Sequence, residues 1–337
     1  MRHQIAFNAL SQQIDDPNTY LHDLRVSCEA FDQANEWLER AEAGDAAVAA
    51  EIPEEHWESI RDNAQISQEA VVVHVNSGQV QAVIDWLKKY IPILLRKIKE
   101  IFMNFFAWIR RKFQQMGRGL TSLQDAVRNS LSSNYTVKLH EPLTERDKFL
   151  ATVFSSMSFY LNVKVPTFSK TTILNPKDTI AELFEVAEGW LVIDRNISPF
   201  KRNDIPPITT AQEGIDFLNT ELKSPRMVML DSEAYLASKY RGPSEINFYK
   251  KTFERTLKDM SKTEENLTYS ADLSVRSIEH DRRFIESLQP VFESNAVDYK
   301  LKLKALNYKL NAVTEGLSWR LRTLDSLLRL ARRAAAA

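Results

Sequence analysis

Apolar side chains recur at intervals of three and four residues along most of the chain, the pattern of helices that bury one face. Residues 135–139 alternate instead between polar and apolar, which predicts a short strand. Gln289-Pro290 separates the two longest periodic segments, so these are expected to form a helical hairpin. The chain is therefore expected to be mainly α, with helical segments, a long C-terminal helical hairpin and a minor β element. The expected helices include residues 2–14, 18–43, 79–119, 120–131, 145–161, 176–190, 210–223, 244–288 and 292–333, together with a short acidic helix that starts at Ile52-Pro53.

Residues 79–119 are the most distinctive of these segments, because aromatic and basic side chains are interleaved along them. The apolar residues fall on one helix face, and nine basic residues in the segment are opposed mainly by Glu100. Pro92 is expected to kink this helix or to start its main run, and Gly117 and Gly119 are expected to end it. No apolar run approaches the roughly 18 residues that are needed to span a bilayer.

Three interpretations of this helix stay open. In the first, it is a core helix with a solvated basic rim, since aromatic stripes at helical spacing most often belong to a core. In the second, it is an interfacial membrane helix, which combines basic residues on one face with Trp, Phe and Leu on the other. In the third, its basic face binds a polyanion such as packaged nucleic acid. The contact residues expected for a nucleic acid or a membrane are Lys88, Lys89, Arg96, Lys97, Lys99, Trp108, Arg110, Arg111 and Lys112.

The net charge of -1 conceals two segments of opposite sign. The first 69 residues hold 15 acidic against 4 basic side chains, whereas the remaining residues hold 30 acidic against 40 basic ones. Charges that nearly cancel in this way suggest an acidic segment that masks a basic body. The expected divisions are an acidic helical propeptide-like segment (1–69), a cationic amphipathic helical segment (70–132) and a helical body with the C-terminal helix pair (133–337).

Motifs of catalysis, metal binding and phosphate binding are mostly absent from the sequence. GxxxxGK[ST], HExxH and GxSxG do not occur, and Gly117-Arg118-Gly119 follows a helix where a dinucleotide site requires a strand. The six histidines are scattered without helical ligand spacing, and Cys28 lies on an apolar stripe. We expect no catalytic residue, metal, cofactor or small-molecule substrate, and hence no enzyme. An enzyme whose site forms only on folding stays a third possibility.

A candidate processing site lies where the charge changes sign. Ser67-Gln68-Glu69 directly precedes Ala70, and the pattern of small residue, any residue and Glu occurs three more times in the first 69 residues. An acidic helical segment that ends in Ser-x-Glu before a basic helical body resembles the internal head proteins of phiKZ-like giant phages. In that family a prohead protease cuts after the Glu, the propeptide is discarded, and the mature protein stays in the capsid with the DNA.

The resemblance implies that Ser67 and Glu69 are recognised by a prohead protease and that the chain is cut before Ala70. It also implies a non-enzymatic virion protein of the capsid interior, present in the host cytoplasm during assembly and able to leave with the genome. Packaged DNA or other head-interior proteins are the partners that it implies. A membrane-active helical protein that acts through residues 80–118 is the alternative from another class.

Overall fold

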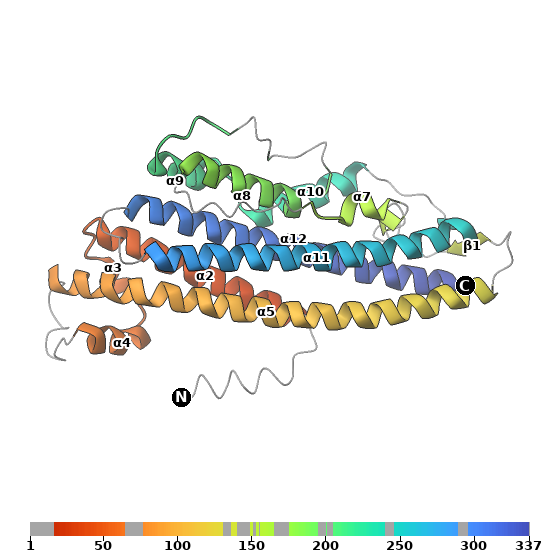
Figure 1. Ribbon diagram of the computed structural model, residues 1–337, viewed down its shortest axis with the longest axis horizontal. Helices are drawn as coiled ribbons and strands as arrows, with labels where there is room; N and C mark the ends of the chain where they lie inside the picture. The colour runs from red at the N-terminus through yellow and green to blue at the C-terminus, as the bar shows by residue number, and fades with distance from the viewer. Residues whose placement is uncertain are drawn as a thin grey trace.

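Four long helices form an elongated bundle (Figure 1). The expectation of a mainly α fold is confirmed. The computed structural model describes residues 17–64, 77–130, 136–139, 149–150, 153–154, 156–164, 175–194, 200, 205–239, 246–288 and 296–336. The long helices are α2 (Pro17–Glu42), α5 (Ser77–Ser130), α11 (Lys250–Leu288) and α12 (Ala296–Ala336). The shorter ones are α3 (Val48–Glu51), α4 (Glu54–Ala64), α7 (Met157–Leu161), α8 (Pro176–Leu191), α9 (Ala211–Thr220) and α10 (Pro225–Lys239). Of these, α7, α8, α9 and α10 cover one side of the bundle, and α4 packs against α5 on the opposite side (Figure 1).

The C-terminal hairpin consists of α11 and α12, which run antiparallel along the bundle (Figure 1). At the end where α11 begins, the short strand β1 (Thr136–Leu139) pairs antiparallel with β2 (Ile246–Tyr249). β1 is the strand expected from the alternation over residues 135–139. The expected helix over residues 2–14 lies outside the described residues.

Helix α5 is longer than the sequence predicted. It runs without interruption for 54 residues through Pro92, Gly117 and Gly119, so the expected end at the two glycines is wrong. A glycine inside a helix costs only about 1 kcal/mol relative to alanine. The apolar face of α5 packs along α2 and α11 over many turns, and tertiary packing of that kind contributes most of the stability of a helix in a protein.

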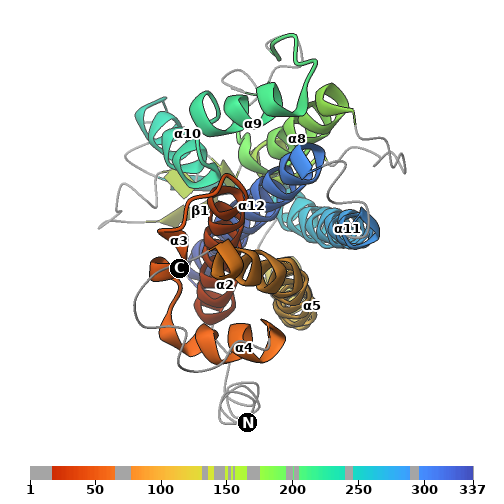
Figure 2. The ribbon, with the colours of Figure 1, turned by 90° about the vertical axis from the view of Figure 1, so that its left-hand side faces the viewer.

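The acidic N-terminal segment is part of the core. Leu24, Phe31 and Leu38 of α2 are almost fully buried and belong to the same hydrophobic cluster as Leu87 of α5 and Leu310 of α12. Figure 2 shows α2 lying between α5 and α12 at one end of the bundle. The three segments expected from charge therefore share one hydrophobic interior within the described residues.

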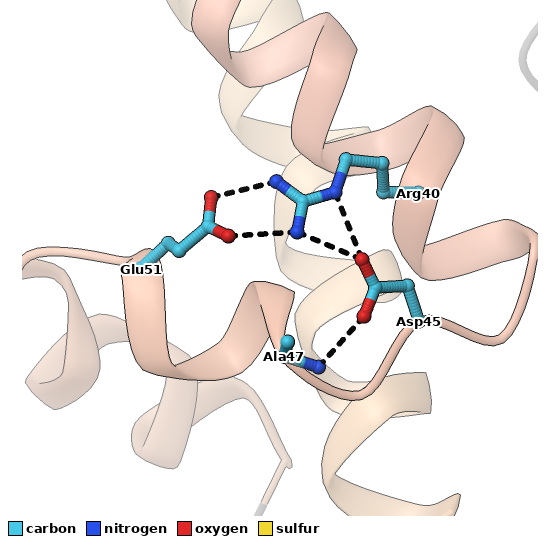
Figure 3. A network of polar contacts seen from close by, with 4 residues as sticks. All are labelled: Arg40, Asp45, Ala47 and Glu51. Carbon is cyan, nitrogen blue, oxygen red and sulfur yellow. Dashed lines mark hydrogen bonds and ion pairs between the residues drawn. The ribbon is translucent and has the colours of Figure 1, made fainter.

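A polar network fixes the end of α2 to the short helix that follows it (Figure 3). Arg40 donates two hydrogen bonds of 2.7 Å to the carboxylate of Glu51 and one of 2.9 Å to Asp45. Asp45 also accepts a hydrogen bond from the backbone N–H of Ala47. Arg40 lowers the pKa of both carboxyl groups through these hydrogen bonds. The turn after α2 is therefore a specific structure rather than a loose connection.

The layer of short helices is joined to α12 by a buried cation. Arg320 is completely buried and donates to the backbone carbonyls of Leu161, Gly189 and Trp190, which lie in the last turns of α7 and α8. Such carbonyls lack partners within their own helices, and a cation is favoured at this end of the helix dipole. Burial lowers the pKa of Arg320 to about 9. Gly316, one turn earlier, allows the close approach, because a Cβ there would overlap the Trp190 carbonyl oxygen.

A buried ion triad joins the two layers at a second point. Lys309 of α12 lies 2.7 Å from a carboxylate oxygen of Glu182 in α8 and 3.0 Å from one of Asp281 in α11. Burial alone would lower the pKa of Lys309, but the attraction of Asp281 and Glu182 outweighs it and raises the pKa. Lys309 therefore stays charged and links α8, α11 and α12.

Candidate nucleic-acid interface

The apolar face of α5 is buried in the bundle. Trp86 and Trp108 are 3% and 7% exposed, and Phe105 is fully buried. The core interpretation therefore describes this face, and the expected surface contact through Trp108 is wrong. A membrane could reach this face only if the bundle opened. No helix among the described residues is long and apolar enough to cross a bilayer.

Three of the expected contact residues point into the seams of the bundle. Lys99 and Arg110 form ion pairs of 3.0 and 2.8 Å with Glu279 and Asp272 of α11. Lys88 lies 3.8 Å from a carboxylate oxygen of Glu42 in α2. These contacts neutralise the cations that border the core, so Lys88, Lys99 and Arg110 position helices instead of offering free charge.

The other expected cations of α5 point outward. Lys89, Arg96, Lys97 and Arg111 are exposed, while the side chain of Lys112 lies outside the described residues. The outward surface continues to Arg118, which is also exposed and was not among the expected contact residues. Arg111 and Arg118 are seven residues apart, which places them on one line of the helix about 10 Å apart.

Helix α11 adds a second row of cations that the sequence analysis missed. Its members follow one another at helical spacing, all are exposed, and none forms an ion pair with another described residue. They are Lys251, Arg255, Lys258 and Lys262. Their spacing of four, three and four residues was readable in the sequence as a basic stripe on one helix face. The sequence-based interpretation of this segment relied on its apolar residues, which lie on the opposite face of the helix.

The two rows adjoin where Arg118 of α5 approaches Lys262 of α11, and the α11 row continues from there toward the end of α5. α5 and α11 run antiparallel and in contact, although α5 extends beyond α11 at its N-terminal end, and the ion pair between Arg110 and Asp272 fixes their relative level (Figures 1 and 2). Arg118 lies eight residues after Arg110 on α5. Because the helices are antiparallel, the same distance along α11 leads from Asp272 back to the turn that contains Lys262. We call the combined surface the basic face; it consists of Lys97, Arg111 and Arg118 of α5 and Lys251, Arg255, Lys258 and Lys262 of α11.

Charge is separated along the molecule. Residues 17–64, at one end, contain 12 acidic and 3 basic side chains. The helix stretches at the other end, residues 104–130, 250–276 and 316–336, together contain 7 acidic and 16 basic ones. Figure 1 shows α3 and α4 at one end of the bundle and the last turns of α5 and α12 at the other. The opposite charges are therefore held apart in space, not only in sequence.

Two hollows of about 410 and 570 Å³ lie beside α12 and beside α11, and neither is lined by a histidine or cysteine. Within the described ranges, no group of three or more potential ligands from His, Cys, Asp and Glu could hold a metal ion. The expected processing residues Ser67, Glu69 and Ala70 lie outside the described residues.

Comparisons with known proteins provide no function that could be transferred to this chain. Scans against protein-family models, curated proteins and solved structures give no match. The basic face and the separation of charge are therefore the features from which a function can be argued.

Proposed function

We propose that this chain is a non-enzymatic virion protein of the phage head interior that binds the backbone of packaged DNA through its basic face. The observation that carries the proposal is the pair of exposed cation rows on neighbouring helices, in the half of the bundle with excess positive charge. Cations in such an array release counterions from DNA when they meet its phosphates, and that release supplies most of the affinity of sequence-independent binding. The resemblance of the sequence to internal head proteins suggests packaged DNA as the polyanion that this surface binds.

Reversal of the α11 row tests the proposal. The variant K251E/R255E/K258E/K262E and the natural chain would be titrated against a labelled duplex of arbitrary sequence, with anisotropy read from 50 to 300 mM salt. The natural chain is expected to bind with a steep salt dependence. The variant is expected to lose about one unit of slope, in log affinity against log salt concentration, for each phosphate contact removed.

The matched control reverses four exposed cations away from the basic face. R25E/K177E/K223E/R226E changes the net charge by the same amount, on exposed residues of α2, α8 and α10 and of the turn before α10. It is expected to keep most of the slope and to bind more weakly only through the overall charge. Equal loss in the two variants would show that binding follows net charge and would overturn the assignment to the basic face.

Contact with a membrane is the other outcome to separate. Binding to anionic vesicles but not to DNA would replace the nucleic acid with a lipid surface. Substitution of Trp86 or Trp108 would then weaken vesicle binding only if the bundle opens, because both side chains are buried.

Cleavage before Ala70 remains part of the proposal, and the packing of α2 changes what it would accomplish. The cut would fall between α4 and α5, while Leu24, Phe31 and Leu38 hold α2 in the core. We therefore expect a nicked protein whose acidic fragment stays bound after cleavage. Intact-mass analysis of protein from its natural particle tests the step, and a mature chain that begins at Met1 would contradict it.

A further inference from the structure

We propose that the basic face of one copy takes up the outward face of α2 from a second copy, so that self-association competes with DNA for the same surface. The inference rests on the proposed function, because it concerns regulation of the same face. The occupant is the acidic N-terminal segment, which the structure places at the other end of the same molecule (Figure 1).

The described helices of the acidic segment, α2 and α4, cannot cover the basic face of their own chain. α2 is held by its buried side chains, and α4 is held by ring contacts of His56 with Trp86 and Tyr90 at 5.2 and 5.1 Å. From Tyr90 to Arg111 the helix rises about 30 Å. The Debye length at physiological salt is about 8 Å, so the acidic end hardly screens the basic one. Masking within one chain, as expected from the charge pattern, does not fit this placement.

A second copy can supply what the first cannot. Glu29 and Glu36 are exposed on the outward face of α2, seven residues apart. Arg111 and Arg118 on the outward face of α5 have the same spacing. Two helices laid side by side can therefore match carboxylates with guanidinium groups at both positions, at a repeat of about 10 Å. A guanidinium group fits a carboxylate with two parallel hydrogen bonds, which gives such pairs geometric specificity.

Apolar side chains accompany the charges on both surfaces. Val26 lies one turn before Glu29 on α2 and is 46% exposed, and Met103 of α5 is also 46% exposed. Single exposed apolar side chains are ordinary on protein surfaces, so the matching spacing of the charges carries the inference. The contact joins different surfaces of the two copies, so each copy keeps one unused surface of each kind. Association of this type builds open chains unless the geometry closes a ring.

Sedimentation velocity of the full chain without DNA tests the inference. We expect a series of oligomers at 50 mM salt and tens of micromolar protein, and monomers at 500 mM salt. E29K/E36K and R111E/R118E should each remain monomeric at low salt. The fourfold variant, which exchanges the charges, should associate again. The control D216K/E233K reverses two exposed acids on α9 and α10 and should associate like the natural chain.

The outcomes separate this inference from DNA binding. A natural chain that stays monomeric at low salt would overturn the inference, as would association that persists in E29K/E36K or fails to return in the fourfold variant. E29K/E36K keeps the basic face, so it should still bind DNA in the anisotropy titration. Unchanged DNA binding in the α11 variant K251E/R255E/K258E/K262E would contradict the proposed function, whereas the association of two copies is decided by the sedimentation result.

Discussion

Replacement of Phe31 by alanine tests whether the acidic segment belongs to the core. The side chain is fully buried on α2, and the ring of Tyr20 on the same helix packs on Phe105 of α5. Phe-to-Ala changes at buried sites cost about 3–5 kcal/mol, from lost transfer free energy and the cavity left behind. We expect Phe31→Ala to lower the free energy of unfolding of the whole molecule by about that amount.

Urea denaturation followed by circular dichroism and by tryptophan fluorescence measures the change. Both signals should report one transition with a lower midpoint and an unchanged slope, because α2 shares its hydrophobic cluster with α5 and α12. Val26→Ala is the matched control on the same helix. Val26 is 46% exposed, so this change should stay within about 0.5 kcal/mol.

A loosely attached arm would behave differently. Its loss of structure would leave the unfolding of the remaining helices unchanged, and Phe31→Ala would produce a separate early transition. A change below about 1 kcal/mol in the main transition, or two resolved transitions in the natural chain, would refute the assignment of α2 to the shared core.

Three further predictions concern the interior and one titrating side chain. Gly316→Ala should destabilise the fold by about 1–3 kcal/mol in the same urea assay, because the added Cβ forces α12 away from the Trp190 carbonyl; an unchanged midpoint would contradict the close approach. Lys309→Met should cost about 3–5 kcal/mol, since it leaves two carboxylates beside an apolar side chain, and acidic pH should recover part of the loss. Burial and then the charge of Glu265 raise the pKa of Glu264 to about 7, above its ordinary value, so the folded state binds this proton more tightly than the unfolded state. Stability is therefore lost as pH rises from about 5 to 7, and Glu264→Gln should raise the melting temperature at pH 8 but not at pH 4.5, as scanning calorimetry would show.

Helical periodicity predicted most of the fold, because each long helix buries a continuous apolar stripe. The break between α11 and α12 coincides with Gln289-Pro290, so the hairpin could be recognised. The expected start of its first helix at residue 244 is wrong, because residues 246–249 form β2 by pairing with the distant β1 and α11 begins at Lys250. The two glycines near the end of α5 misled the prediction. Local propensity favoured a helix end there, and packing that is not visible in a single segment extended the helix by 11 residues beyond Gly119.

The candidate interface was only partly predictable, because the number of cations in a segment does not show in which direction each side chain points from the helix. The sequence grouped all the cations of α5 as contact residues, yet Lys99 and Arg110 pair with α11 whereas Arg111 faces outward. Neighbouring residues on a helix point about 100° apart, so Arg110 and Arg111 have different surroundings. The stripe on α11 was visible as a spacing, but only the antiparallel packing places Lys262 near Arg118.

The bundle changes thickness where α2 begins. α2 extends only to the level of Phe105, where Tyr20 near its first turn contacts that ring. Beyond this level the described long helices are α5, α11 and α12 alone. Hydrogen exchange should therefore be fastest in the helices of that thinner half, where local opening costs least free energy. Most of the basic face, which would bind the backbone of curved DNA, therefore lies on the half of the bundle expected to open locally most easily.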